Sequence, residues 1–395
     1  MTTDLPSLLG LSLFAWSFTV ASVSLEAARR TWVSRFRQTK RAKAPSFSGV
    51  SVLVVRPCAG HEATLERTLS SLAKAKRSFA LRCRFAIEGP SDTAVAAATR
   101  AVEALQKAGI EAEIVFTGGG GPNRKAAQLA VAASGAAILV ACDSDVDLEG
   151  VDLDQLVAPL VGAGGTWVSW APPAERGSAL TLGDLASAAV LGGSLHAFPL
   201  LAQLDPAGLV GKLFAIRQEA LSAIGGFGSL VDYLGEDMEI ARRVREQGGA
   251  VVAVPLVARS LAAGRSWDVV VGRFARWLTV IRAQRAFLLL SYPALFFATV
   301  PIVLVSALLA FVAPTAALVS ALLAITARLG VAWLAASIAG RKRGPLQLVR
   351  DVALADGMLA AAFVRALGTR TVTWRDRVLV VDRTGLLHEP SALKS

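Results

Sequence analysis

Two carboxylates spaced one residue apart follow a short apolar run in this sequence. Residues 137–142 are apolar or small, and Asp143-Ser144-Asp145 comes directly after them. Such a run predicts a buried parallel strand, and open α/β sheets bind ligands at the carboxyl ends of such strands. Asp143 and Asp145 could therefore be shared between a nucleotide and a hard divalent cation beside its diphosphate. An Asp-Ser-Asp after a strand is also an ordinary turn or helix cap, so other motifs must decide.

Two loops in the same half of the chain could contact a nucleotide. In Glu88-Gly-Pro-Ser-Asp92 a carboxylate could receive the base or ribose, although the bare motif is also typical of a turn. Residues 118–125 (GGGGPNRK) form a glycine loop that opens a helix, where backbone N–H groups, the helix dipole and Lys125 could meet a phosphate. A linker would explain the glycines. It would not explain the two cations at a helix start, where the dipole disfavours them.

Two later motifs could carry the chemistry and close the site. Glu236-Asp237 stands at a predicted helix start, where carboxylates are also ordinary caps. Arg273 and Arg276 lie three residues apart with Trp277 beside them, so two cations and a ring could close over a diphosphate. A basic helix at a membrane edge with an interfacial Trp is the alternative.

The elements that must position these residues alternate between strands and helices from about residue 50 to residue 255. We expect strands at 50–55, 81–87, 111–116 and 137–142, and helices at 62–76, 93–108 and 123–133. This order predicts an α/β domain with a mostly parallel sheet and right-handed crossovers. Residues 185–204 are uncharged, but a span there would put Asp145 and Asp237 on opposite sides of a membrane. We therefore expect that segment to be buried or interfacial.

The composition excludes an ordinary soluble enzyme. The chain has 395 residues, of which 54% are hydrophobic, and its mean hydropathy is +0.53. The formal net charge of +11 comes from 41 basic against 30 acidic residues. Because the basic residues cluster beside apolar runs, they indicate an anionic membrane surface and not a nucleic acid. Three cysteines without metal-ligand spacing predict neither a disulfide framework nor a zinc site, and fit a reducing compartment.

Charge-free stretches predict membrane helices at both ends of the α/β domain. Residues 5–24 are uncharged and a basic segment follows, so the positive-inside rule places the N-terminus outside and the α/β domain in the cytosol. A cleaved signal peptide is the alternative, but it would carry its positive charges first. Helices at 287–312 and 315–339 would form a hairpin that returns to the cytosol. Residues 346–367 carry four charges, each costing roughly 2.5–3.5 kcal/mol at a helix centre, so we expect them to lie along the cytosolic interface.

Taken in order, the motifs resemble those of family 2-type glycosyltransferases with a GT-A fold, above all ceramide glucosyltransferases and bacterial relatives that glycosylate ceramide or hopanoid lipids. The motifs in that order are Arg56-Pro57, Gly121-Pro-Asn123-Arg-Lys125, Cys142-Asp143-Ser144-Asp145, Gly225-Gly226-Phe227, Glu236-Asp237, Arg273-Phe-Ala-Arg276-Trp277 and Thr373-Trp374-Arg375. Two residues depart from the family pattern. Met238 stands where relatives usually carry Tyr, and Gly89 stands where many have Asp. These departures concern the acceptor more than the reaction.

The resemblance implies a role for each matching residue. It makes Asp237 the catalytic base and places His196 and Glu236 on the acceptor side. It assigns Mg²⁺ or Mn²⁺ to Asp145 and Asp143. The residues that it implies for nucleotide-sugar binding are Asp92, Lys125, Asp143, Arg273, Arg276 and Trp277.

The function that we expect is inverting transfer of a hexose or N-acetylhexosamine from a UDP-sugar to the hydroxyl of a membrane lipid, most simply ceramide. The alternatives are a hopanoid or other lipid acceptor, a processive polysaccharide synthase, and a catalytically silent scaffold that binds a nucleotide-sugar. About three membrane segments are few for a polysaccharide channel, and retention of every required carboxylate argues against a scaffold.

The expected organisation has six parts. They are an N-terminal transmembrane helix (1–27), a basic juxtamembrane linker (28–48), a cytosolic GT-A catalytic domain (49–262), an interfacial helix with the Arg-x-x-Arg-Trp motif (263–285), a transmembrane hairpin (286–340), and an interfacial helix with a C-terminal hairpin (341–395). The expected location is a membrane with the catalytic domain in the cytosol, such as a bacterial inner membrane. The sequence does not name the sugar, the lipid or the oligomeric state.

Overall fold

The computed structural model describes residues 5–39, 46–162, 164–369, 371–374 and 377–389. The chain divides into two compact units, and each unit is built from stretches that are separated in sequence. The first unit comprises residues 1–37, 179–204 and 263–372, and the second comprises residues 38–178, 205–262 and 373–395.

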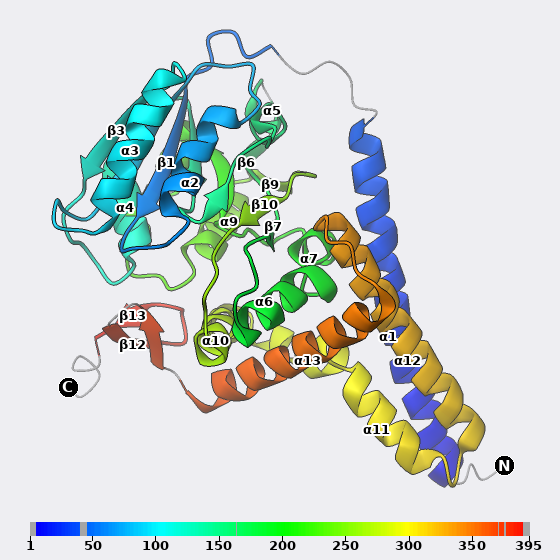
Figure 1. The fold of residues 1–395 in the computed structure, drawn as a ribbon. Coiled ribbons are helices and arrows are strands. Elements are labelled where there is room, and N and C mark those ends of the chain that lie inside the picture. Colours follow the sequence, from blue (N-terminus) through cyan, green and yellow to red (C-terminus); the bar gives the residue numbers. More distant parts are fainter. Residues whose placement is uncertain (1–4, 40–45, 163, 370, 375–376, 390–395) are drawn as a thin grey trace. The chain divides into compact units, whose positions relative to one another are not determined.

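A seven-stranded sheet lies at the centre of the second unit (Figure 1). The strand order is β3-β2-β1-β4-β8-β6-β9; β8 runs antiparallel to both of its neighbours, and the other adjacent pairs are parallel. The strands are β1 (Val52–Cys58), β2 (Leu81–Ile87), β3 (Glu111–Phe116), β4 (Ile138–Cys142), β6 (Thr166–Trp170), β8 (Leu213–Arg217) and β9 (Ala250–Ala253). The four strands expected from the sequence are confirmed, and so is an α/β domain combined with apolar helices.

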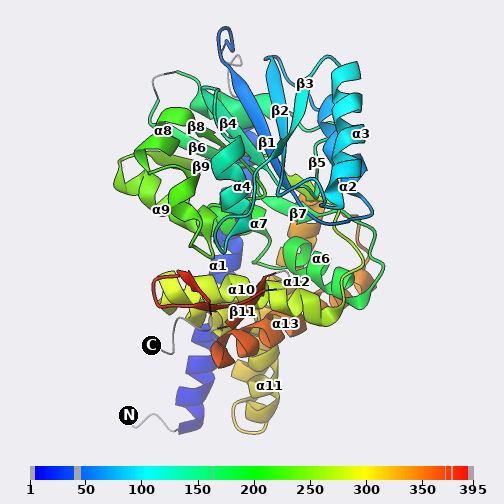
Figure 2. The same cartoon turned by 90° about the vertical axis from the view of Figure 1, so that its left-hand side faces the viewer.

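Helices cover both faces of this sheet because its central strands are apolar on both faces. Val52 and Val54 of β1 point to one face, where they join a buried cluster with residues of α2, α3 and α5. Leu53 and Val55 are equally buried on the opposite face, and α4 packs against β1 and β2 (Figure 2). The helices of this unit are α2 (Leu65–Ser70), α3 (Ala94–Lys107), α4 (Arg124–Ala132), α5 (Leu153–Val157), α8 (Gln218–Ala223) and α9 (Glu236–Glu246). The helix expected at 62–76 is shorter, because a 3₁₀ turn follows α2.

Two smaller sheets complete the strand inventory of the described residues. One contains β5 (Val146–Asp147), β10 (Ala258–Ser260) and β7 (Pro173–Glu175), in that order. The other contains β11 (Thr371–Trp374), β12 (Arg377–Val381) and β13 (Leu387–His388). The small C-terminal hairpin expected around Trp374 is therefore present. Arg375 of the Thr373-Trp374-Arg375 motif lies outside the described residues.

The first unit is helical. Its helices are α1 (Leu5–Thr39), α6 (Leu182–Gly193), α7 (Phe198–Leu204), α10 (Trp267–Gln284), α11 (Thr299–Leu309), α12 (Pro314–Ile338) and α13 (Pro345–Gly368). The basic segment that we expected to be a linker from residue 28 continues α1 as far as Thr39.

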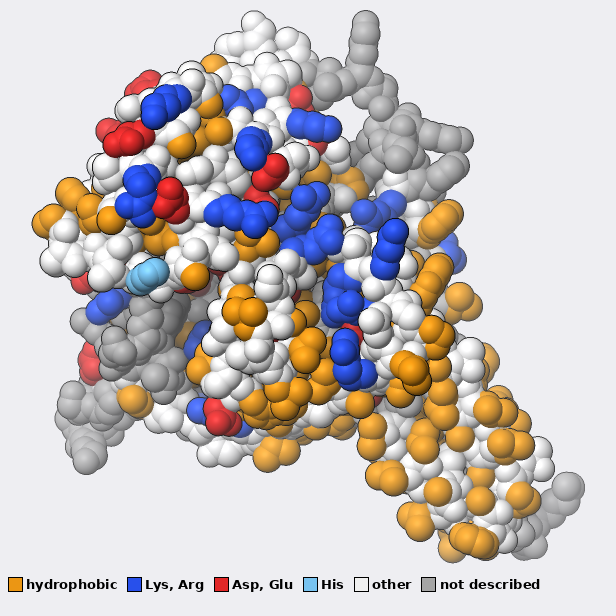
Figure 3. All heavy atoms as spheres, viewed as in Figure 1, with side chains coloured by type: hydrophobic (Ala, Val, Ile, Leu, Met, Phe, Trp, Pro, Cys, Tyr) orange, Lys and Arg blue, Asp and Glu red, His pale blue; other side chains and the backbone are white. Residues whose placement is uncertain are grey.

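Apolar side chains cover the outer surface of α11 and α12 (Figure 3). Leu308 and Phe311 are 74% and 91% exposed, while Leu13, Ile302 and Ala324 pack together where α1, α11 and α12 meet. Among the described residues, three helical segments are long and apolar enough to cross a membrane: Leu5–Arg35, Leu182–Leu204 and Pro314–Ile338. This surface is therefore compatible with a membrane protein.

The prediction of one continuous helix at 287–312 is wrong. The chain forms a 3₁₀ turn at Ala286–Leu290, a π turn at Tyr292–Phe296 and then α11, with a bend of 55° between Ala286–Phe296 and α11. Pro293 has no N–H to donate to the preceding turn, and Phe297 leaves the helical conformation with φ −125° and ψ 26°. The two parts together still meet the length and composition test for a span.

The uncharged segment at 185–204 is also broken. Gly192 departs from helical geometry (φ −142°, ψ 28°), and α7 begins only at Phe198. α6 packs against α10, α12 and α13, and 78% of the most apolar part of Leu182–Leu204 lies buried. The expectation that this segment is buried agrees with its packing, although its length and composition would also suit a span.

The two carboxylates among the charges expected to keep residues 346–367 out of the lipid core contact protein partners. The Asp351 side chain of α13 is 1% exposed and accepts hydrogen bonds from Arg341 (3.0 Å) and Arg343 (2.9 Å). Asp356, five residues further along α13, binds Arg328 of α12 at 2.8 Å. Arg328 also donates to the Gly193 carbonyl oxygen. Two buried carboxylates thus join α13 to α6, α12 and the basic loop after α12.

We predict that Asp351→Ala strongly destabilises the protein, because it leaves the buried guanidinium of Arg341 and the partly buried one of Arg343 without their carboxylate. Breaking a buried pair in this way costs roughly 3–5 kcal/mol. Thermal unfolding of the detergent-purified protein measures the effect. Glu66→Ala is the matched control, since it removes the exposed pair between Glu66 and Arg100, whose side chains are 50% and 55% exposed, and should change stability by about 1 kcal/mol or less. Equal shifts in Tm for the two variants would contradict the claim that Asp351 stabilises the fold more than an exposed ion pair does.

Candidate active site

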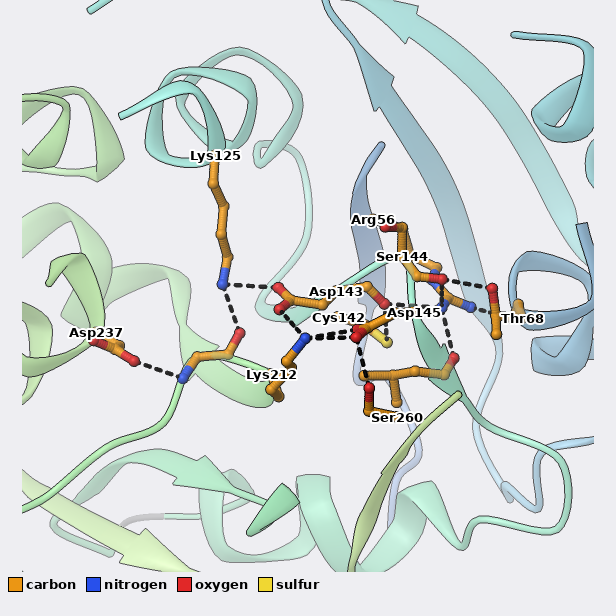
Figure 4. Close-up of polar contacts among 12 residues, drawn as sticks. Arg56, Thr68, Lys125, Cys142, Asp143, Ser144, Asp145, Lys212, Asp237 and Ser260 are labelled. Atoms are coloured by element: carbon orange, nitrogen blue, oxygen red, sulfur yellow. Dashed lines mark hydrogen bonds and ion pairs between the residues drawn. The ribbon is translucent and has the colours of Figure 1, made fainter. Parts of the chain in front are cut away.

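The candidate site lies in the second unit, where β4 ends and β8 begins. Cys142 pairs with Leu213 in the antiparallel register, so Asp143 stands opposite Lys212, and the Asp143 N–H donates to the Lys212 carbonyl oxygen at 2.9 Å. This places Asp143 and Asp145 beside the segment that leads into β8 (Figure 4). The expected position of the pair at the carboxyl end of a parallel strand is thus observed.

Lys125 joins three of the predicted motifs. Its ammonium lies 2.8 Å from Asp143 Oδ1 and 3.3 Å from Glu236 Oε1, and it donates to the Gly211 carbonyl oxygen at 2.7 Å. Burial alone would lower the pKa of Lys125, but the charges of Asp143 and Glu236 outweigh it and raise the pKa. Lys125 is therefore a fixed cation among carboxylates.

The start of α4 explains how Lys125 reaches this place. Asn123 caps the helix by accepting from the Ala126 N–H at 3.0 Å, and its amide donates to Glu236 Oε2 at 3.0 Å. Gly121 has φ +65°, and a Cβ there would meet the Val231 side chain at 2.9 Å. The glycine and asparagine of this loop thus allow close packing against the chain that leads into α9.

Asp237 lies in the first turn of α9 and faces the same segment before β8. Its Oδ2 accepts from the Gly211 N–H at 2.9 Å, and its Oδ1 accepts from its neighbour Met238 at 2.8 Å. Removal from water and the charge of Glu236 raise the pKa of Asp237 to about 6, while Lys125 and the two N–H groups act in the opposite direction. A carboxylate with this pKa is ionised at neutral pH and basic enough to accept a proton from a hydroxyl group.

Asp145 is held by Lys212 and Ser260. Lys212 Nζ lies 2.8 Å from Oδ1 and 2.7 Å from Oδ2 of Asp145, and it also lies 3.2 Å from Asp143 Oδ2. The Ser260 hydroxyl of β10 donates to Asp145 Oδ2 at 2.6 Å. Figure 4 shows Lys212 between the two aspartates.

Arg56 fixes the turn that presents the two aspartates. Its side chain is fully buried at the end of β1 and donates to the carbonyl oxygens of Asp143 (2.9 Å), Val146 (2.6 Å) and Thr68 (2.6 Å). These acceptors are all backbone oxygens, so the guanidinium holds main chain in place and leaves the aspartate side chains to other groups.

The C-terminal hairpin supports the segment that leads into α9. The Leu234 N–H donates to the Gly385 carbonyl oxygen at 3.1 Å, and the Leu387 N–H donates to the Asp232 carbonyl oxygen at 2.7 Å. Both groups belong to the second unit. The last part of the chain therefore contributes backbone hydrogen bonds only a few residues before Glu236-Asp237.

Asp92 serves the loop geometry around it. Its Oδ1 accepts from the Gly60 N–H at 2.8 Å and from the Ala94 N–H at 2.9 Å, which joins the loop after β1 to the start of α3. Glu88 lies 3.3 Å from Arg124. A nucleotide-binding role for Asp92 remains a prediction.

The remaining predicted residues form a cluster in the first unit. The His196 ring stacks on the Trp277 ring with centroids 6.1 Å apart and planes 3° apart, and His196 Nε2 is hydrogen-bonded to Tyr292 Oη at 2.9 Å. The Arg273 guanidinium lies over the Trp277 ring at 5.4 Å and contacts the Ser187 hydroxyl. Burial, followed by the charge of Arg273, lowers the pKa of Arg276 to about 10. His196, Arg273 and Trp277 are thus brought together on helical elements.

The aspartate pair fits a divalent cation only in company with other oxygen donors. Among the described residues no group of three or more His, Cys, Asp or Glu side chains is arranged to hold a metal ion. Mg²⁺ and Mn²⁺ sites in nucleotide-dependent enzymes often use one or two carboxylates, with phosphate oxygens and water as the other ligands. Asp143 and Asp145 supply that minimum.

Three residues of this site were not assigned a role from the sequence. Lys212 and Ser260 were not predicted at all, and Arg56 was noticed only as part of a family-like motif. Lys212 is a single charge in front of the apolar residues of β8, a strand that we did not predict. A lysine or arginine directly beside a strand end is the signal that would have found Lys212 and Arg56.

The fold and the site define a glycosyltransferase-like α/β domain joined to apolar helices. The family model described as glycosyl transferase family 21 matches residues 12–387, which is nearly the whole chain. The chain therefore belongs to glycosyl transferase family 21. This confirms the resemblance that the order of motifs gave. No curated protein matches the chain.

Several solved structures are similar to the chain at low identity. One is a mannosyltransferase from Pyrobaculum calidifontis in complex with GDP-Man and Mn²⁺, with 17% identity, 90% of this chain and 99% of that chain covered, and a TM-score of 0.45. Another is glucosyl-3-phosphoglycerate synthase from Mycobacterium tuberculosis with Mn²⁺, UDP and glucosyl-3-phosphoglycerate, with 21% identity, 59% and 80% covered, and a TM-score of 0.36.

The raised pKa of Asp237 predicts the acid limb of the pH–rate profile. With Asp237 as the base that the sequence predicts, protonation would remove the proton acceptor, so kcat/KM for sugar transfer should fall about tenfold per pH unit below about pH 6 and stay level above it towards neutrality. Initial rates between pH 4.5 and 8 in a buffer of constant ionic strength measure this limb. A rate that stays constant down to pH 4.5 would mean that no group with this pKa has to be ionised.

Proposed function

We propose that the chain is an inverting transferase that moves a hexose or N-acetylhexosamine from a UDP-sugar to the hydroxyl of a membrane lipid, with ceramide as the first candidate. The observation that carries this proposal is the cluster in which Lys125 binds Asp143, Glu236 and the Gly211 carbonyl oxygen, while Asp237 accepts from the Gly211 N–H. Asp143 on the proposed donor side and Asp237 as the proposed base are thereby both linked to Gly211, the first through Lys125 and the second directly. Family membership supports the transfer of a sugar.

In the proposed reaction Asp237 removes the proton from the acceptor hydroxyl. A hydroxyl oxygen is a poor nucleophile, so it loses its proton to the Asp237 carboxylate while it attacks the anomeric carbon. The new glycosidic bond forms as the bond between that carbon and the UDP oxygen breaks, and the electron pair leaves with UDP. Attack from the face opposite UDP inverts the anomeric configuration.

Cations of this chain would stabilise the charge that develops on UDP. Asp143, Glu236 and the Gly211 carbonyl oxygen hold the Lys125 ammonium, so its position is fixed before the reaction begins. Arg276 and Arg273 would add planar guanidinium groups that can bind two phosphate oxygens each. Asp143 and Asp145 would hold Mg²⁺ or Mn²⁺, which when bound neutralises diphosphate charge.

A lipid acceptor is supported by the helical elements of the first unit. Three segments are long and apolar enough to cross a membrane, and large apolar residues such as Phe311 and Leu308 are exposed. His196, Trp277 and Tyr292 form an aromatic group with one hydroxyl and one imidazole, which suits the polar end of an amphipathic acceptor. Under this proposal His196 and Glu236 lie on the acceptor side.

The proposed topology keeps the transferase domain and the C-terminal hairpin in the cytosol, with the six-part domain organisation given above. Its basis is the clustering of basic residues after the N-terminal apolar segment and on both sides of the segment at 286–340. Anionic lipid headgroups would be the partners of these basic residues.

A catalytically silent nucleotide-sugar-binding scaffold is the main alternative from another class. The two differ in whether the protein releases UDP when a lipid acceptor is added. The purified full chain in nanodiscs should release UDP from a UDP-sugar only when ceramide or another hydroxyl lipid is present. Binding of the UDP-sugar without any release across a panel of lipid acceptors would favour the scaffold.

We predict that Asp237→Asn separates binding from turnover. The amide keeps the size of the carboxylate but cannot take the proton, so kcat should fall by roughly 10²-fold or more while the Kd for the UDP-sugar stays within a few-fold. UDP release and equilibrium binding measure the two quantities. Asp152→Asn is the matched control, because Asp152 also accepts a backbone N–H at a helix start, at α5, and should leave both unchanged. Loss of binding together with turnover would make Asp237 a structural cap.

A further inference from the structure

Lys212 binds the two aspartates that a divalent cation would need. Its ammonium contacts both carboxylate oxygens of Asp145 at 2.7 and 2.8 Å and Asp143 Oδ2 at 3.2 Å. The fourth oxygen, Asp143 Oδ1, lies 2.8 Å from Lys125, and Ser260 adds a hydrogen bond to Asp145 Oδ2. Every carboxylate oxygen of the pair therefore has a cationic partner.

The two lysines are held differently. Lys125 also binds Glu236 and a backbone carbonyl oxygen, so its ammonium is tied to α9 and to the segment before β8. The Lys212 main chain is fixed by the hydrogen bond from the Asp143 N–H, whereas its ammonium lies at the end of a flexible side chain that is 23% exposed. Rotation of the Lys212 side chain can therefore move its ammonium off the aspartates while the Lys212 main chain keeps its hydrogen bond to Asp143.

A divalent cation and the Lys212 ammonium cannot share these oxygens at low cost. Two positive groups a few ångströms apart repel each other strongly in a site partly shielded from water. Four carboxylates, Asp143, Asp145, Glu236 and Asp237, lie around the ammonium groups of Lys125 and Lys212. A diphosphate that arrives with a divalent cation would offer the displaced ammonium new oxygen acceptors.

We propose that Lys212 competes with the divalent cation for Asp143 and Asp145, so that the cation binds tightly only together with a nucleoside diphosphate. Lys212 then moves from the aspartates to the diphosphate oxygens, and the negative charge of the pair is neutralised both before and after the exchange. The inference rests on the proposed function, because it assumes that the aspartate pair is the cation site of the transferase. It makes cation and diphosphate binding mutually dependent, with the same coupling factor seen from either side.

Equilibrium binding of Mn²⁺ to the full chain in nanodiscs, with and without UDP, tests the proposal. Electron paramagnetic resonance of free Mn²⁺ gives the Kd directly and needs no catalysis. For the natural sequence, saturating UDP should tighten Mn²⁺ binding by roughly tenfold or more. In Lys212→Met, the Kd for Mn²⁺ without UDP should fall by roughly tenfold or more, and the coupling to UDP should shrink by a similar factor. Lys74→Met is the matched control, because Lys74 pairs with Glu149 on the surface, and should change neither value.

Two outcomes would overturn the proposal. If Lys212→Met and Lys212→Gln bind Mn²⁺ without UDP no more tightly than the natural sequence, Lys212 does not compete for the pair. If Asp145→Asn also leaves Mn²⁺ binding unchanged, the cation site itself is elsewhere, and that part of the proposed function fails too. Loss of Mn²⁺ binding in Asp145→Asn alone, with no gain in the Lys212 variants, leaves the function intact and removes only the competition. Thermal shifts on adding Mn²⁺ provide a second readout for variants that are less stable.

Discussion

The site depends on one arrangement of charge: carboxylates from two distant parts of the chain meet around the ammonium of Lys125. Asp143 follows β4 and Glu236 starts α9, and each would repel the other without a cation between them. The Gly211 residue closes the group, since its carbonyl oxygen accepts from Lys125 and its N–H donates to Asp237. Asp143, Glu236 and Asp237 are therefore fixed relative to one another through backbone as well as side chains.

Two other buried charged groups among the described residues are also held by specific partners. Arg56 has no exposed surface and donates hydrogen bonds to backbone carbonyl oxygens of the turn that carries the aspartates. In the first unit Arg328 binds Asp356 and the Gly193 carbonyl oxygen, so a cation in an apolar helix joins α12 to α13 and α6. Such pairs contribute positional specificity, because each partner is costly to bury alone.

The sequence predicted the elements with strong periodicity and missed those whose form depends on tertiary contacts. β4 is a short apolar run, β2 and β3 begin with alternating charged and apolar residues, and Asp143 and Asp145 stand at the expected end of β4. β8 was not predicted because Leu213–Arg217 follows an irregular stretch. Lys212, which directly precedes β8, was therefore not predicted either. The break after Phe296 was not predicted either, since the prolines of an apolar run do not reveal at which of them a helix will bend. Arg56 and Ser260 act through distant partners, which spacing along the chain cannot show.

The central claim is that the cluster around Lys125 transfers a sugar to a membrane lipid with Asp237 as the base. Mass spectrometry of lipids from cells that produce the natural sequence, compared with cells that produce equal amounts of membrane-inserted Asp237→Asn protein, tests this claim most directly. The account predicts a lipid that is heavier by one hexose or N-acetylhexosamine residue and that depends on the natural Asp237. Identical lipid profiles in the two cell types, with sugar incorporated into polysaccharide or not at all, would contradict it.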